Sequence, residues 1–225
     1  MKYEKIICGK FIDRPNRFIA HVMVEEKVET VHVKNTGRCK ELLIPGVRVV
    51  LEVCNNPDRK TKFDLICVYK EGVGLINMDS QAPNKVVYEW LRLNEDITFL
   101  KPEYKYGNSR LDAYFEKGSE KCLMEVKGVT LERNGTCYFP DAPTERGVKH
   151  MEELIGALKE GYSCYLAFVI QMEGVDTVYP NGETHKLFEE TYYKALEAGV
   201  RVLMLGCSVT EDELKINRCK EFKTT

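Results

Sequence analysis

The strongest constraint on the fold is a change of sequence pattern near residue 80. Before it, short segments rich in Val, Ile, Phe and Tyr are separated by turn-forming residues, which is typical of an all-β module. Strands are expected at residues 18–24, 28–33, 47–54 and 63–69. The size suits a small barrel of the OB type, although periodicity does not separate it from an SH3-like barrel.

After residue 80, strand and helix patterns alternate, which predicts an α/β domain. The polar stretch 77–84, which contains Pro83, marks the boundary, or seam, between the two domains. We therefore divide the chain into a β-barrel at 1–80 and an α/β domain at 81–225. Asn84 and Thr144 are expected to cap two helices. The remaining expected elements are strands at 111–115, 122–129, 137–139, 163–171 and 201–207 and a helix at 184–198.

Composition narrows the class of protein. The chain is 44% hydrophobic and 30% charged, which indicates a folded globular protein. Its longest apolar run, residues 164–170, is far shorter than the ~20 residues that span a bilayer. Nine isolated cysteines without a CxxC pair favour reduced thiols over disulfides or a zinc ribbon. The sequence thus predicts a cytoplasmic protein with no membrane partner.

The net charge of the chain limits how the protein can bind nucleic acid. The net charge is -2, so no large positive field draws DNA to the whole molecule. Residues 1–80 hold 14 Lys+Arg and 11 Asp+Glu, a local excess of positive charge. If DNA is bound, local basic patches must bind it.

Residues 111–128 are predicted to form a β-hairpin that turns at Gly118-Ser119, because Gly takes the positive φ of a type II′ turn. Opposed residues in that hairpin have numbers that sum to 237. Asp112 then faces Glu125 across the strands, and Lys127 shares a face with Glu125.

This placement makes Asp112, Glu125 and Lys127 a candidate catalytic set. Two opposed carboxylates repel unless a cation bridges them, and Mg²⁺ or Mn²⁺ suits such oxygen ligands. A bound metal with an adjacent ammonium group is suited to phosphodiester hydrolysis. From spacing alone, an ordinary Glu–Lys pair on an exposed strand is the commoner explanation.

Other residues could support the same site. Glu89 is a weaker candidate metal ligand, since an exposed helical Glu is more common. The helix that begins after Thr144 could receive a phosphate at its N-terminus. Asp141 and Gln171 stay ambiguous between a site role and a structural one. The candidate DNA-binding residues are Arg38, Lys40, Arg59, Lys60, Lys62, Arg110, Arg146, Lys149 and His150.

The segment 107–112 followed by Glu125-Val126-Lys127 resembles the D…(D/E)xK core of the PD-(D/E)xK nuclease superfamily. In that superfamily an Asp and a Glu bind metal and the Lys assists the nucleophile. Further motifs make nearly the whole chain similar to the sugar fermentation stimulation protein A (SfsA) family. These motifs are His32, residues 35–38, 41–43, 45–46, 59–61 and 64–65, Pro83-Asn84, and residues 128–131 and 139–150.

The resemblance implies an N-terminal OB-like domain and a C-terminal PD-(D/E)xK-like domain in a DNA-binding protein. It also implies a link to the regulation of sugar (maltose) metabolism in bacteria. The expected function is largely sequence-independent DNA binding, with a nuclease-type metal site whose turnover is left open. The alternatives are a non-catalytic DNA-binding regulator of sugar (maltose) metabolism genes and a hydrolase of a small phosphorylated metabolite.

Overall fold

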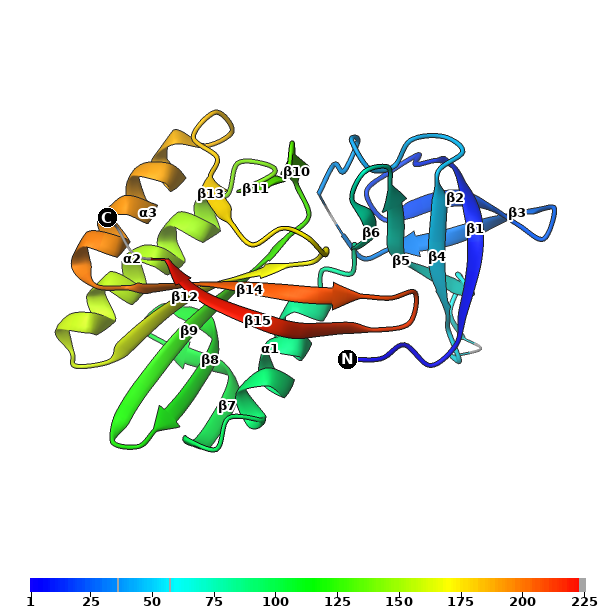
Figure 1. Cartoon of the computed structure of the whole chain (residues 1–225). Coiled ribbons are helices and arrows are strands. Elements are labelled where there is room, and N and C mark those ends of the chain that lie inside the picture. Colours follow the sequence, from blue (N-terminus) through cyan, green and yellow to red (C-terminus); the bar gives the residue numbers. More distant parts are fainter. Residues whose placement is uncertain (36, 57, 223–225) are drawn as a thin grey trace.

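The strand-rich first part of the chain folds into a five-stranded barrel, as predicted (Figure 1). The strand order β3-β2-β1-β4-β5-β6 is closed by a parallel pairing of β3 with β5. The computed structural model describes residues 1–35, 37–56 and 58–222. The barrel strands are β1 (Ile6–Asp13), β2 (Ile19–Val24), β3 (Lys27–Val33), β4 (Arg48–Val53), β5 (Phe63–Lys70) and the added strand β6 (Gly74–Asn77).

Strand β1 was not among the predicted strands. Its backbone passes close to β2 at Gly9. A Cβ at Gly9 would lie 2.5 Å from Val22 Cγ1 and 2.8 Å from the carbonyl oxygen of Met23. A glycine inside a strand is typical of such a close approach.

The C-terminal domain is a mixed six-stranded sheet with helices on both faces (Figure 1). The order is β15-β14-β12-β9-β8-β7; α2 and α3 pack on one face and α1 on the other. A small sheet, β10-β11-β13, lies beside it. The elements are α1 (Ala82–Arg92), β7 (Ile97–Tyr106), β8 (Ser109–Lys117), β9 (Glu120–Val129), β10 (Glu132–Arg133), β11 (Thr136–Phe139), α2 (Glu145–Lys159), β12 (Ser163–Ile170), β13 (Val178–Pro180), α3 (Lys186–Ala198), β14 (Arg201–Val209) and β15 (Leu214–Phe222).

The predicted hairpin register is confirmed. β8 pairs with β9 from Ala113↔Met124 to Lys117↔Glu120, and each pair sums to 237. Gly118 has a φ of +59°, the positive value that the turn requires.

One helix cap was predicted correctly and the other was wrong. The Thr144 hydroxyl accepts the backbone N–H of Gly147 at 3.0 Å at the start of α2. Helix α1 starts earlier than predicted, with Gln81 at its N-cap, so Asn84 lies inside the first turn. The Asn84 side chain is therefore available for another contact, described below.

A buried polar network holds the two domains together at the seam. Asp79 is completely buried, and its Oδ2 accepts hydrogen bonds from Tyr3 Oη at 3.3 Å and Lys34 Nζ at 3.2 Å. Gln171, which follows β12, donates from Nε2 to the carbonyl oxygens of Asn77 and Asp79 at 3.0 and 3.2 Å. The ambiguous Gln171 thus has a structural role, since it ties the C-terminal sheet to the end of the barrel.

A second buried carboxylate, Asp64, lies within the barrel. Arg59 donates to it at 2.6 and 3.1 Å, and Lys34 and His32 lie within 3.2 and 3.0 Å. Burial alone would raise the pKa of Asp64, but the Arg59 hydrogen bonds and the Lys34 charge lower it to about 2.

Asp64 is therefore expected to make stability depend on pH. Because its pKa is lower in the folded chain, it contributes about 2 kcal/mol above the unfolded pKa of about 3.9. That contribution is lost as pH falls from about 4 to about 2. Urea unfolding at pH 6 and at pH 2.5 should show that Asp64→Asn costs much less stability at the lower pH. The exposed Asp58→Asn serves as the control, and an equal cost of Asp64→Asn at both pH values would contradict this account.

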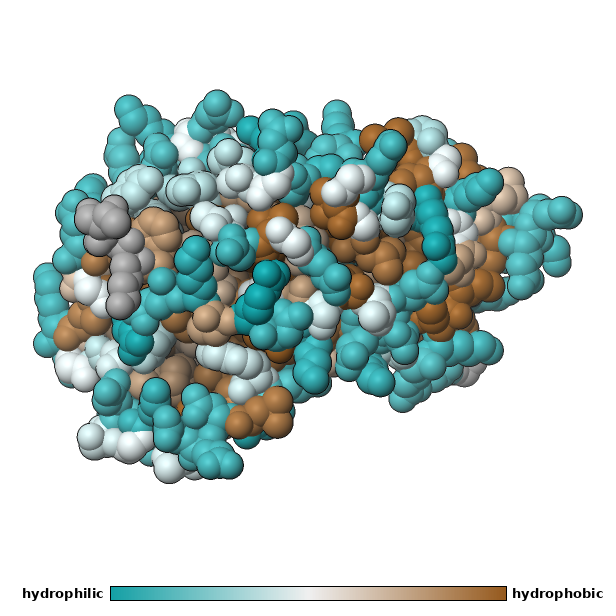
Figure 2. Space-filling model, in the orientation of Figure 1, coloured by the Kyte–Doolittle hydropathy of each residue, from teal (hydrophilic) through white to brown (hydrophobic). Residues whose placement is uncertain are grey.

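Hydrophilic side chains cover most of the C-terminal domain on the face seen in Figure 2, and apolar ones gather over the barrel. Among the described residues, no helix is both long and apolar enough to cross a membrane.

Candidate functional site

The candidate site lies in a fork where strands β8 and β9 separate. Their pairing ends at Ala113↔Met124, after which β8 continues against β7 and β9 against β12. The backbone N–H of Val126 donates instead to Asp112 Oδ2 at 2.8 Å. The side-chain carboxylate of Asp112 thus replaces a main-chain acceptor of the sheet. Asp112 and Glu125, which were predicted to face each other, lie one position beyond the last β8–β9 pair.

Asp112 is held in place by helix α1. Asn84 Nδ2 donates to Asp112 Oδ1 at 2.8 Å, and Tyr88 Oη donates to its carbonyl oxygen at 2.7 Å. Asn84 and Tyr88 are four residues apart and therefore share a helix face. Burial and the nearby charge of Glu125 raise the pKa of Asp112. A cation beside Asp112 would favour its ionised form.

Glu125 is buried, with 2% of its surface exposed. Its Oε1 lies 2.5 Å from both Lys127 Nζ and His150 Nδ1. Its Oε2 is also buried and has no hydrogen-bond partner within the described part of the chain. Burial raises the pKa of Glu125, but the His150 hydrogen bond and the Lys127 charge outweigh it and keep the pKa below its ordinary value. One buried oxygen of an ionised carboxylate is therefore left without a hydrogen-bond partner among the described residues.

These donors fit a hard divalent cation. Mg²⁺ is usually bound by one or two carboxylates, with water and phosphate oxygens completing the shell. Asp112 and Glu125 supply two carboxylates, and each Asp112 oxygen carries one hydrogen bond and can accept another interaction. Residues 1–35, 37–56 and 58–222 contain no cluster of three or more His, Cys, Asp and Glu that could enclose a metal by themselves. A cation held by Asp112 and Glu125 would therefore need water or substrate oxygens as its remaining ligands.

His150, predicted to contact DNA, is buried beside Glu125. Its ring is 3% exposed, with Nδ1 at Glu125 and Nε2 3.4 Å from Arg146 Nε. His150 therefore positions Glu125. The helical pattern carried a signal for this, because His150 lies four residues before the buried Leu154 and one after the exposed Lys149.

Glu89 lies away from the fork. Its carboxylate accepts a hydrogen bond from the amino group of Met1 at 2.6 Å, and its side chain is 52% exposed. The helix contacts to Asp112 come from Asn84 and Tyr88, which sequence reasoning did not select. The sequence feature that could have indicated these contacts is the four-residue spacing of Asn84 and Tyr88, which places both on one face of the helix.

Three predicted basic residues gather beside the fork. Arg110, Arg146 and Lys149 are exposed and line a cleft of about 640 Å³ that also reaches His150. Arg110 pairs with Glu103 at 3.2 Å, with both side chains largely exposed. Glu145 and Glu152 also line this cleft, so its charge is mixed, with the basic side chains in excess.

Arg38 and Lys40 line a second cleft, of about 680 Å³, between the barrel and the loop that leads into α2. Arg14 also lines it and was not selected from the sequence. Its guanidinium donates to the carbonyl oxygens of Arg17, Asn35, Gly37 and Arg38 and so organises this loop. Thr36, part of the same motif, lies outside the described residues.

The barrel loop contacts the C-terminal domain closely. A Cβ at Gly37 would lie 2.4 Å from Asp141 Oδ2, which places the ambiguous Asp141 against the barrel. Lys60 and Lys62 are exposed on another barrel loop, whereas the guanidinium of Arg59 is bonded to Asp64. The predicted basic residues therefore lie in three places: beside the fork, in the cleft lined by Arg38 and Lys40, and on the loop that carries Lys60 and Lys62.

Comparisons with known proteins match both domains. A family model described as the SfsA N-terminal OB domain matches residues 12–78. A model described as the sugar fermentation stimulation protein RE domain matches residues 81–213. The matches meet at the polar seam.

Similar whole proteins support the same assignment. Sugar fermentation stimulation protein homologues from Clostridium beijerinckii and Ruminiclostridium cellulolyticum are 57% and 53% identical. The first match covers 96% of both chains, and the second covers 99% of this chain and 100% of the relative. The structure described as Pyrococcus furiosus SfsA in complex with Ca²⁺ matches with a TM-score of 0.81 and 27% identity, over 96% of each chain.

Proposed function

This chain belongs to the sugar fermentation stimulation protein family, and from that premise we propose that it binds DNA and hydrolyses phosphodiester bonds at Asp112 and Glu125. Mg²⁺ or Mn²⁺ is the proposed cofactor. The observation that carries the proposal is the buried Oε2 of Glu125, which has no hydrogen-bond partner among the described residues. An ionised oxygen held in that state is costly unless a ligand binds it.

Each residue of the fork has a separate task in this proposal. Asp112 and Glu125 hold the cation, which when bound would neutralise charge on the phosphate. Asn84 orients Asp112, and His150 orients Glu125. The ammonium group of Lys127 has three donors, so it can bond Glu125 and still position a water or a phosphate oxygen.

The proposed DNA surface is the pair of basic clefts. Arg110, Arg146 and Lys149 lie beside the fork, and Arg38 and Lys40 lie on the barrel. Such side chains contact the phosphate backbone, which carries no sequence information, so we expect largely sequence-independent binding.

Removing Arg146 or Lys149 is expected to weaken duplex binding without changing sequence preference. Each phosphate contact contributes about 0.9 to the slope of log affinity against log salt, so Arg146→Ala or Lys149→Ala should each reduce that slope by about 1. Fluorescence anisotropy of labelled duplexes at a series of salt concentrations measures this. Arg133→Ala removes an exposed Arg paired with Glu183, away from both clefts, and is the control. An unchanged slope in both cleft variants would place the DNA elsewhere.

A second candidate function is DNA binding without cleavage, as in a regulator of sugar metabolism genes. The favouring observation is that Lys127 and His150 already contact Glu125, which stabilises its charge without a metal. Purified protein with single-stranded, duplex and branched DNA plus Mn²⁺ separates the two functions. Cleavage that Asp112→Asn leaves unchanged would show that the activity came from elsewhere, and binding without any cleavage would favour the regulator.

A further inference from the structure

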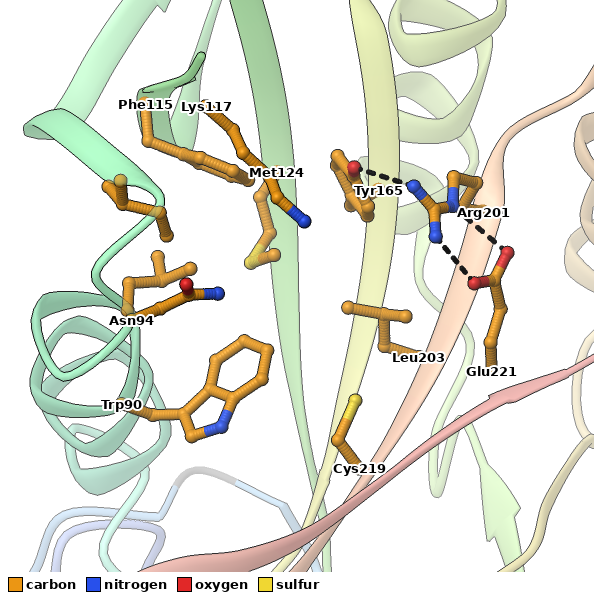
Figure 3. A pocket seen from close by; sticks show the side chains of 12 residues that line it. Trp90, Asn94, Phe115, Lys117, Met124, Tyr165, Arg201, Leu203, Cys219 and Glu221 are labelled. Carbon is orange, nitrogen blue, oxygen red and sulfur yellow. Dashed lines mark hydrogen bonds and ion pairs between the residues drawn. The ribbon is translucent and has the colours of Figure 1, made fainter. Parts of the chain in front are cut away.

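A pocket of about 310 Å³ lies on the face of the C-terminal sheet opposite the fork (Figure 3). Its floor is formed by Phe115, Met124 and Leu203, each at most 6% exposed. Trp90 of α1 forms one wall. Met124 precedes Glu125 on β9, so the two side chains point to opposite faces of the strand. The pocket therefore shares no residue with the fork.

The shape and lining of the pocket suit an aromatic ring. Its volume is near the lower end of the ~300–1,000 Å³ range of small-molecule sites. An indole ring and a thioether both make favourable contacts with aromatic rings. A ligand that fills this space is expected to be flat and to have about two fused rings.

The mouth of the pocket offers hydrogen-bond donors on one side. Lys117 is 43% exposed, and its ion partner Asp96 is as far away as 3.8 Å. The side-chain oxygen of Asn94 accepts the Asp96 backbone N–H at 3.1 Å, which leaves the amide NH₂ as a donor. Figure 3 shows the Lys117 ammonium and the Asn94 amide pointing into the pocket.

On the opposite side of the mouth, the positive charge of Arg201 is paired with the negative charge of Glu221. The guanidinium of Arg201 donates to both carboxylate oxygens of Glu221 at 2.9 and 2.6 Å and to Tyr165 Oη at 2.9 Å. The less strongly paired charge at the mouth is thus the positive one on Lys117. An anionic group on the ligand would complement it.

We propose that this pocket binds a flat, two-ring aromatic monoanion. The rings lie over Met124 and beside Trp90, and the anionic group accepts hydrogen bonds from Lys117 and Asn94. The site is independent of the proposed nuclease function.

Trp90 is the only tryptophan in the chain and lines this pocket, so it is the single tryptophan donor for energy transfer, while competition and the variants below locate the bound probe. The probe is 1-anilinonaphthalene-8-sulfonate, and energy transfer from Trp90 to the probe is the signal. We expect saturable binding and displacement by 2-naphthoate. Lys117→Met keeps the apolar stem and should weaken binding about tenfold, from the loss of one charge-assisted hydrogen bond. The exposed Lys121→Met on β9 is the matched control and should leave affinity unchanged.

A blocking variant tests the location independently. Cys219 lies on the exposed side of β15 at the mouth, so Cys219→Phe should reduce probe binding without altering the buried core. Circular dichroism checks that each variant is folded. The proposal is overturned if 2-naphthoate fails to displace the probe, or if Lys117→Met and Cys219→Phe both bind it as the unaltered chain does. DNA cleavage is measured separately, and its absence would leave this test unaffected.

Discussion

Glu125→Gln is expected to lower Mn²⁺-dependent DNA cleavage by about 10³-fold, the scale of losing a major electrostatic contribution to catalysis. The substitution keeps the shape of the side chain but replaces a charged oxygen ligand with an amide. It should leave DNA affinity unchanged, because the basic clefts are intact. The measurements are the initial rate of cleavage of a labelled DNA and the anisotropy of the same DNA without metal.

The matched control is Glu120→Gln, which lies on the same strand but in an exposed position, bonded to Ser163 Oγ at 2.8 Å. Cleavage by this control should equal that of the unaltered chain. If Glu125→Gln cleaves DNA at the same rate as the control, Glu125 has no part in catalysis.

Asp79→Ala is expected to lower the free energy of unfolding by about 3 kcal/mol, since it leaves the hydrogen-bond donors of Tyr3 and Gln81 without their acceptor in a buried place. Asp79 is completely buried, and its carboxylate holds Lys34, Tyr3 and the backbone N–H of Gln81. Urea unfolding followed by circular dichroism measures the loss.

Glu183→Ala is the control for this second substitution. It removes a carboxylate whose side chain is 86% exposed and whose partner Arg133 is 3.4 Å away. Exposed pairs contribute at most about 1 kcal/mol. A loss of similar size in both variants would mean that the polar seam is not a main source of stability.

The sequence predicted the hairpin register but not the fork. Alternation and the Gly118 turn fix which β8 residue pairs with which β9 residue, and these are local properties. The fork depends on Asp112 accepting the Val126 N–H and on α1 packing against it. Such tertiary contacts leave no local pattern, so Asn84 was assigned to a helix cap.

Strand β7 was also missed in the sequence, because its pattern is masked by polar residues. β7 lies at one edge of its sheet, where one side of the strand needs no partner and polar residues are tolerated. Residues such as Lys101 and Glu103 therefore hid the strand pattern. The contact of His150 with Glu125 was not predicted either, because a polar residue on a helix is usually exposed, whereas His150 is buried.

The most direct test of the central claim is anomalous diffraction from a crystal soaked in Mn²⁺. A peak is expected between the carboxylates of Asp112 and Glu125, within coordination distance of Glu125 Oε2, and no such peak is expected in Glu125→Gln. A peak that persists in Glu125→Gln, or a fully occupied Mn²⁺ bound only at other residues, would contradict it.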